Sequence, residues 1–206
     1  MKTKVVFFVL SLTVFLPAVG AYASVLDFET LAHTDEYLSA GSTYTEDGFV
    51  LKNTAGNDPL FAVWGEAAAY GYTGSAALFN DNVNGQTVLA MTDLNVFALS
   101  SIDLAELLYS DVYEQQSVVT FTGIRNDGQI VSQSFTLDNV FGLETFSFSS
   151  EFTNLVMVSW LQTPEFHQFD NINATPVPEP ASLLLFGCGL VSVAFLGKRR
   201  ETGRQQ

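Results

Sequence analysis

Between residues 24 and 175, short runs of alternating apolar and polar side chains are separated by Gly, Asn and Asp, and no long stretch keeps a helical period. These runs predict strands over Val25–Thr30, Gly48–Lys52, Leu60–Trp64, Ala76–Phe79, Thr87–Met91, Val96–Asp103, Ser117–Thr122, Gln129–Leu137, Thr145–Phe148, Leu155–Leu161 and Gln168–Ile172. Short strands that recur roughly every ten residues are typical of a sandwich or a barrel. We therefore expect an all-β domain, arranged as a two-sheet β-sandwich of the jelly-roll type.

Local patterns refine this expectation at two places. Residues 126–128 (Asn-Asp-Gly) predict a hairpin turn between two strands, because such sequences supply the positive φ that primed turns need. Residues 101–113 are ambiguous, since Ile102, Leu104, Leu107 and Leu108 fit a short helical turn. We expect a strand that runs into a loop there, with a short helix as the alternative.

The first 23 residues have the pattern of a secretory signal peptide. Lys2 and Lys4 form a charged region, residues 5–16 are apolar, and Ala21-Tyr22-Ala23 places small residues at the cleavage positions. The apolar run is short for a bilayer span. We therefore expect signal peptidase to cleave after Ala23 and leave a domain over residues 24–175, rather than an uncleaved anchor helix.

Residues 176–206 consist of three parts in a fixed order. The sequence Val177-Pro178-Glu179-Pro180 comes first, an apolar helix is expected over residues 181–197, and residues 198–204 form a basic end. The apolar run is at the lower limit of a bilayer span, and the basic cluster after it is expected to stay in the cytoplasm. The tail is therefore expected to hold the domain on the outer side of a membrane.

These three parts together resemble the PEP-CTERM sorting signal, which is recognised by exosortases in Gram-negative bacteria that make exopolysaccharide. The resemblance implies processing near Pro178-Glu179-Pro180, followed by delivery to the cell surface or the extracellular matrix. It covers only the tail and does not bear on the activity of the domain. The alternative is an ordinary C-terminal membrane anchor.

The charge of the domain excludes one class of partner. With the two ends set aside, Lys52 and Arg125 remain against about twenty carboxylates, a net charge near −18. A surface without a cationic patch cannot release counterions from phosphates, so we expect no nucleic-acid binding. Cys188 is the single cysteine and lies in the tail, so no disulfide stabilises the domain.

Catalysis finds little support in the sequence. It lacks G-x-S-x-G, H-E-x-x-H, P-loop and glycine-rich dinucleotide motifs. His33 and His167 are the only histidines, and the sequence marks no Ser, Asp or Cys partner for either. We expect no enzyme. The alternative is a secreted polysaccharide hydrolase, because two of the many carboxylates could have the spacing of a glycosidase pair.

Acidic residues near the two ends of the domain indicate a structural calcium. In a strand, Asp27 and Glu29 would share one face with Phe28 on the other, and Asp170 lies on the last predicted strand. Calcium takes six to eight oxygen ligands, so these three carboxylates are its candidate ligands. The alternative is that water satisfies them.

The same residues carry a second resemblance. Asp27-Phe28-Glu29 and Phe169-Asp170-Asn171-Ile172 are similar to segments of ectodomains found upstream of PEP-CTERM tails, and of jelly-roll carbohydrate-binding modules. The resemblance implies that the first and last strands pair and that acidic residues on them hold calcium. It rests on two short segments at opposite ends of the domain.

Aromatic side chains are the candidate glycan-binding residues, because flat rings offer apolar area at small entropic cost. The candidates are Trp64, Tyr70, Tyr72, Tyr109, Tyr113 and Trp160. Tyr70 and Tyr72 lie in a Gly/Ala-rich loop and are the most site-like, whereas Trp160 on an apolar strand is expected in the core. We expect a non-catalytic surface or matrix protein that binds extracellular polysaccharide in biofilm; a structural matrix component without a ligand is the further alternative.

Overall fold

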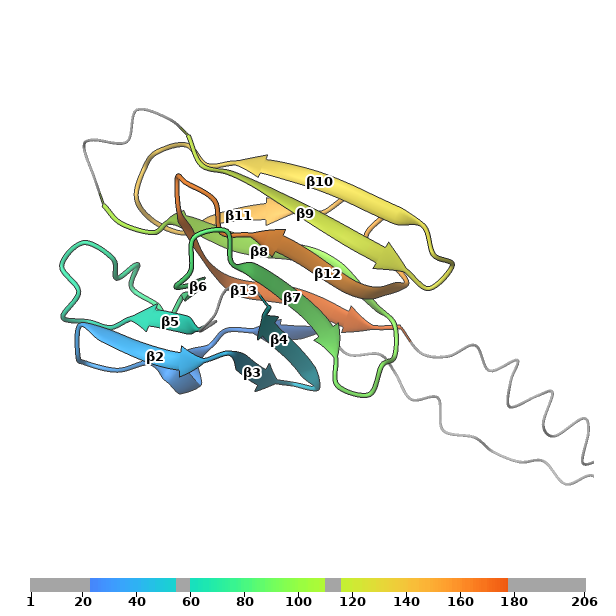
Figure 1. Ribbon diagram of the computed structural model, residues 1–206, viewed down its shortest axis with the longest axis horizontal. Coiled ribbons are helices and arrows are strands. Elements are labelled where there is room, and N and C mark those ends of the chain that lie inside the picture. The colour runs from blue at the N-terminus through green and yellow to red at the C-terminus, as the bar shows by residue number, and fades with distance from the viewer. Residues whose placement is uncertain (1–22, 55–59, 110–115, 178–206) are drawn as a thin grey trace, which may run out of the picture.

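The computed structural model describes residues 23–54, 60–109 and 116–177, which are almost entirely strand and loop (Figure 1). The strands are β1 (Ser24–Leu26), β2 (Tyr37–Gly41), β3 (Thr43–Glu46), β4 (Phe49–Asn53), β5 (Phe61–Trp64), β6 (Leu78–Asn80), β7 (Gln86–Met91), β8 (Phe97–Glu106), β9 (Val118–Arg125), β10 (Ile130–Thr136), β11 (Glu144–Ser147), β12 (Leu155–Leu161) and β13 (His167–Pro176). A short 3₁₀ helix, η1, covers Glu29–Leu31. The all-β prediction is confirmed.

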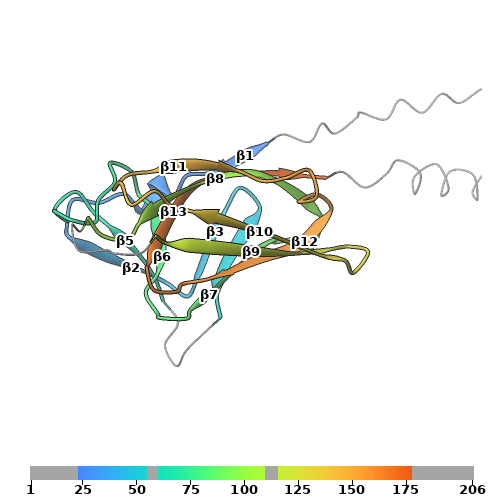
Figure 2. The ribbon, with the colours of Figure 1, turned by 90° about the horizontal axis from the view of Figure 1, so that it is seen from above.

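Hydrogen bonds join these strands into one antiparallel sheet with two recognisable groups. One group runs β10-β9-β12-β7-β4-β3, and the other runs β2-β5-β6-β13-β8-β11, with β1 beside β13. Figure 2 shows β1, β8 and β11 on one side of the molecule and β7, β9 and β12 on the other, with β2 and β5 of the second group curving toward the side of β7. The pairing of the first strand with the last, implied by the resemblance of the two end segments, is observed between β1 and β13.

The predicted division into two sheets differs from the structure at one point. Leu155, at the start of β12, pairs both with Arg125 of β9 and with Phe97 of β8. This residue belongs to both groups of strands. The two groups therefore form one continuous sheet that folds over on itself, rather than two separate sheets.

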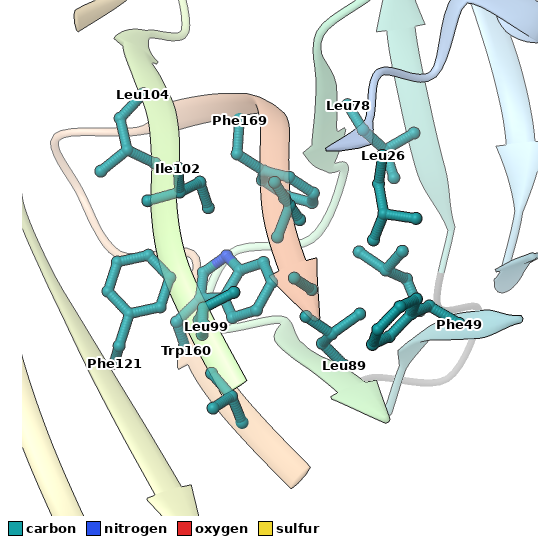
Figure 3. Packing of buried hydrophobic residues seen from close by; sticks show 14 of the residues in the cluster. Leu26, Phe49, Leu78, Leu89, Leu99, Ile102, Leu104, Phe121, Trp160 and Phe169 are labelled. Atoms are coloured by element: carbon teal, nitrogen blue, oxygen red, sulfur yellow. The ribbon is translucent and has the colours of Figure 1, made fainter. Parts of the chain in front are cut away.

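The core lies between the two groups and is rich in phenylalanine (Figure 3). Trp160 of β12 packs edge-on against Phe169 of β13, with ring centroids 5.0 Å apart. Phe49 of β4 meets Phe97 of β8 in the same way at 5.4 Å. Such edge-to-face contacts add to the stabilisation that burial itself provides. Trp160 is almost fully buried, which confirms its predicted place in the core.

Each predicted strand overlaps an observed one, but β2 and β3 were not predicted. β2 has no buried residue, and β3 has only Tyr44, between the exposed Thr43 and Thr45, so neither shows an alternation long enough to be recognised as a strand. The strand predicted over Val25–Thr30 is wrong after Leu26, because Phe28 has φ of 54° and η1 follows it. β8 continues to Glu106 and residues 107–109 are not helical, so the helical alternative is wrong as far as residue 109, and residues 110–113 lie outside the described residues.

The predicted hairpin turn at residues 126–128 is confirmed, in a different form. Arg125 N–H donates to the carbonyl of Gln129 at 2.9 Å, and Gly128 N–H donates to the carbonyl of Arg125 at 2.9 Å. Gly128 has φ of 81°, whereas Asn126 and Asp127 keep negative φ. The connection is therefore the three-residue loop with one left-handed glycine, not a two-residue primed turn.

Among the described residues, no helix has the length and apolar character that a membrane span requires. The predicted signal peptide falls outside the described residues except for Ala23. Pro178, Glu179 and Pro180 of the sorting motif, the apolar helix over 181–197 and the basic end over 198–204 also lie outside them. Val177 is described, and its N–H donates to the carbonyl of Val96 at 2.8 Å.

Candidate functional site

A pocket of about 430 Å³ opens beside the end of β5. It is lined by Glu36, Trp64, the turn over residues 67–71, Leu108 and Tyr109. Trp64 is the last residue of β5, and Tyr109 follows β8, so strands of one group deliver the two rings from different parts of the chain. Tyr70, in the turn after β5, completes an aromatic lining.

Packing beneath the pocket fixes these rings. The Trp64 indole stacks on Phe79 with ring centroids 5.1 Å apart and meets Tyr37 edge-on at 5.7 Å. A Cβ on Gly71 would lie 2.6 Å from the Trp64 ring, so the turn can approach the indole this closely only with glycine at position 71. Trp64 is thus held as a rigid wall of the pocket.

A backbone hydrogen bond places the two tyrosines side by side. Tyr109 N–H donates to the carbonyl of Tyr70 at 2.5 Å, which ties the segment after β8 to the turn after β5. Tyr70 is 66% exposed and Tyr109 is 52% exposed, so both rings present apolar area to solvent. Tyr109 also contacts Phe141 edge-on at 6.0 Å. Flat rings held at the mouth of a preformed pocket are suited to stacking on an apolar ligand face.

The candidate residues from the sequence are only partly brought together here. Tyr70 lines the pocket, whereas Tyr72 is half-buried and is not among the described lining residues. Trp64 and Tyr109, weighed as candidates, do line it. Tyr113 lies outside the described residues. Sequence reasoning missed Glu36, and no motif around that residue could have indicated it.

The polar groups of the pocket are few. Glu36 is the single carboxylate among the described lining residues. The buried Nε1 of Trp64 has no hydrogen-bond acceptor in the part of the chain that the structure describes. Glycoside hydrolysis by the usual route needs two carboxyl groups on either side of the scissile bond. The described lining supplies one such group, Glu36.

A second hollow, of about 300 Å³, lies over β9 and β12. Its lining is dominated by hydroxyl groups, among them Thr120, Thr122 and Ser159, and its one aromatic side chain, Trp160, is almost fully buried. It offers hydrogen-bonding groups but little exposed ring surface. The first pocket is therefore the better candidate for a ligand with flat apolar faces.

The candidate calcium ligands are separated into a pair and a single residue. Ser75 Oγ lies 2.8 Å from Glu29 Oε1 and 2.6 Å from Asp170 Oδ2, so this hydroxyl joins the two carboxylates. Asp27 Oδ1 instead accepts the N–H of Glu29 at 3.1 Å. The expected strand geometry is wrong, because Glu29 lies in η1, yet the turn still carries its carboxylate toward Asp170. Ser75 was not foreseen from the sequence.

In the Glu29–Ser75–Asp170 group, a single hydroxyl proton is available for two carboxylates. A hydroxyl has one hydrogen and can donate to one carboxylate at a time. Burial raises the pKa of Asp170 to about 6, and the charges of Glu29 and Asp103 also raise it, whereas hydrogen bonds from Ser75 and the Asn171 N–H lower it. The group can therefore take up a proton or a cation near neutral pH.

Comparison with known proteins identifies the tail. Residues 176–200 match the PEP-CTERM protein-sorting motif, so the chain carries that motif, as the sequence predicted. The match spans the tail and not the domain. No curated protein matches the chain.

Among solved structures, family 29 carbohydrate-binding modules are similar to the domain. One such module matches at 8% identity and TM-score 0.35, covering 76% of this chain and 90% of its own. A variant complexed with mannohexaose matches at 8% identity and TM-score 0.36, covering 76% of this chain and 93% of its own. A variant complexed with cellulohexaose matches at 9% identity and TM-score 0.35, covering 76% of this chain and 92% of its own. TM-scores of this size do not establish a shared fold.

Proposed function

We propose that the chain is an exported surface or matrix protein whose β domain binds neutral glycan at the pocket of Trp64, Tyr70 and Tyr109. The observation that carries this proposal is the pair of exposed tyrosines, tied together by a backbone hydrogen bond at the mouth of a preformed pocket. Sugar rings have flat C–H faces that stack on such side chains and hydroxyl groups that suit Glu36. The domain acts as a binding module and not as an enzyme.

The sorting motif at residues 176–200 supports export. In this proposal the tail anchors the protein in the membrane until an exosortase-type enzyme cleaves it, and the domain then remains at the cell surface or in exopolysaccharide. The continuous sheet, folded over a phenylalanine core, supports a β-sandwich of the jelly-roll type. Glu29 and Asp170, joined through Ser75, bind a structural calcium that fastens η1 to β13.

Glycan binding is tested by replacing both exposed tyrosines. The Tyr70→Ala, Tyr109→Ala variant is expected to lose at least about tenfold in affinity for gels carrying neutral glucan or mannan, since tenfold corresponds to only about 1.4 kcal/mol and two stacking rings are removed. Affinity electrophoresis measures the retention. Tyr72→Ala, which leaves the described pocket lining intact, is expected to retain more binding than the double variant.

Ile130→Ala serves as the control for surface truncation, because Ile130 is 69% exposed and lies on β10, away from the pocket. The net charge near −18 opposes acidic polymers, so a polyuronate gel is expected to retain the protein only when calcium bridges the two. Absence of retention on any gel, with calcium present, would favour a purely structural matrix component. Release of reducing sugar from a gel, stopped by Glu36→Gln, would favour a hydrolase.

Processing is tested on protein recovered from the surface of an exosortase-bearing host. Mass spectrometry is expected to find a mature chain that starts at Ser24 and lacks residues 183–206, because the signal peptide and the sorting tail have both been removed. A Pro178→Ala, Pro180→Ala variant is expected to keep its tail and stay with the membrane fraction. Surface-exposed wild-type protein with an intact tail would contradict the sorting step.

A further inference from the structure

Three carboxylates meet where β8 ends and β11 begins. Glu106 is the last residue of β8, Glu144 is the first residue of β11, and Asp138 lies in the loop between β10 and β11. Each offers one carboxylate oxygen, and these three oxygens all lie within 4.8 Å of one another. The cluster belongs neither to the aromatic pocket nor to the Glu29–Ser75–Asp170 group.

Glu106 is the unusual member of this cluster, because its carboxylate is buried without a hydrogen bond of standard geometry. The residue is 4% exposed, and neither of its carboxylate oxygens accepts a hydrogen bond of standard geometry in the described part of the chain. A buried carboxylate without a partner is costly to keep charged, so it needs a proton or a cation. Asp138 and Glu144, by contrast, accept backbone N–H groups at 2.7 and 3.2 Å.

The described part of the chain supplies no nearby positive charge for Glu106. His167 pairs with Glu106 across β8 and β13, but burial lowers the pKa of His167 to about 3, so the ring is neutral at physiological pH. Lys52 lies on β4, in the other group of strands. Arg125 ends β9 and lies 4.0 Å from the carboxylate of Asp127. These two residues are the only Lys and Arg between residues 24 and 175.

The cluster members also repel one another. Burial raises the pKa of Glu106, and the charges of Glu144 and Asp138 raise it further. The backbone N–H groups of Glu106 and Asn139 interact with the carboxylate and lower its pKa. Burial raises the pKa of Glu144, and the charge of Asp138 raises it too, against a lowering by the Asp138 N–H. Three like charges gathered around a buried oxygen pair are what a bound cation would stabilise.

We propose that Glu106, Asp138 and Glu144 form a calcium-binding site. Calcium binds oxygen at about 2.3–2.6 Å, so two oxygens on one calcium ion can be up to about 5 Å apart. Magnesium binds at about 2.0–2.1 Å, which limits the same separation to about 4 Å. The three oxygens all lie within 4.8 Å of one another, which is inside the separation that a calcium ion can bridge. Water completes the shell on the exposed side of Asp138.

The calcium site also lies next to the aromatic pocket. The loop that contains Asp138 also carries Phe141, whose ring contacts Tyr109 edge-on at 6.0 Å. A calcium ion on Asp138 would order this loop and so brace Tyr109. This consequence rests on the proposed glycan binding, whereas the metal site itself does not.

Calorimetric titration of the full chain with calcium chloride alone tests the site. The Asp170→Asn background removes the Glu29–Asp170 pair as a source of binding. In this background we expect one calcium ion per chain with a dissociation constant of about 0.1–1 mM, the range of extracellular modules. Adding Glu106→Gln, which keeps the shape of the side chain, is expected to weaken binding at least tenfold. Adding Asp138→Asn, in the exposed loop, tests the same site without touching the core.

Asp127→Asn is the matched control, because Asp127 is also a loop carboxylate that accepts a backbone N–H, from Gln129 at 3.0 Å. Its titration is expected to match that of the background. Unchanged calcium affinity in both Glu106→Gln and Asp138→Asn would overturn the site, as would the absence of saturable binding up to 10 mM calcium. Equal competition by magnesium would overturn it as well, since diffuse screening does not distinguish the two ions.

Discussion

Replacing Phe169 with alanine is expected to lower the free energy of unfolding by about 3–5 kcal/mol, the usual cost of truncating a buried phenylalanine. Phe169 is fully buried on β13, where it pairs with Leu104 of β8 and with Leu78 of β6. Its ring meets Trp160 at 5.0 Å and Phe28 at 5.8 Å, both edge-on. One side chain thus contacts both groups of strands and the turn before η1, and the cavity left by alanine could not close easily.

Urea unfolding measures the change. The urea concentration at the midpoint should fall, whereas the dependence of the unfolding free energy on urea concentration should stay the same. The midpoint of thermal unfolding is expected to fall by roughly 10 °C for a domain of this size. Ile130→Ala is the control, because this side chain is mostly exposed and its truncation should change stability by less than about 0.5 kcal/mol. A loss below 1 kcal/mol for Phe169→Ala would mean that β13 does not pack across the core as described.

The strands could be predicted where burial alternates along them. β9 and β12 show this alternation, and the Asn-Asp-Gly sequence between β9 and β10 indicates the hairpin turn. β2 and β3 could not be predicted, because β2 buries no residue and β3 buries only Tyr44, which is too short a period-two signal. The pairing of Leu155 with strands of both groups could not be predicted from the sequence either, since tertiary packing determines which strands pair across the groups.

The candidate sites were less predictable than the strands. Aromatic residues could be singled out as ring-bearing candidates, but which of them share a pocket depends on the approach of the turn after β5 to the segment after β8. The strand expected to carry Glu29 ends before Phe28, which has φ of 54°, and the Ser75 hydroxyl that joins Glu29 to Asp170 comes from a distant part of the chain. Glu106 could not be distinguished from the other acidic residues, because the sequence does not show that a carboxylate is buried without a hydrogen bond of standard geometry.

Replacing Asp170 with asparagine is expected to stabilise the calcium-free protein at neutral pH. Burial raises the pKa of Asp170 from its ordinary value of 3.8 to about 6. Since the folded-state pKa is above the unfolded one, the protonated carboxyl stabilises the fold, fully below about pH 4, and this contribution is lost as the pH rises through 6. Asparagine is neutral at every pH and keeps the stabilisation. The gain at pH 7.5 is expected to be on the order of 2 kcal/mol, or roughly 5 °C in the midpoint of thermal unfolding.

Thermal unfolding of wild type and Asp170→Asn in chelator, between pH 4 and pH 8, measures this difference. The two midpoints should converge at pH 4 and separate above pH 6, while Asp127→Asn, an exposed carboxylate, should follow wild type throughout. If Glu29 and Asp170 bind calcium, added calcium should raise the midpoint of thermal unfolding of wild type more than that of the variant, because binding only to the folded state adds stability. A variant less stable than wild type at pH 7.5 in chelator would show instead that the fold uses the charged form of Asp170, held by the Ser75 hydroxyl and the Asn171 N–H.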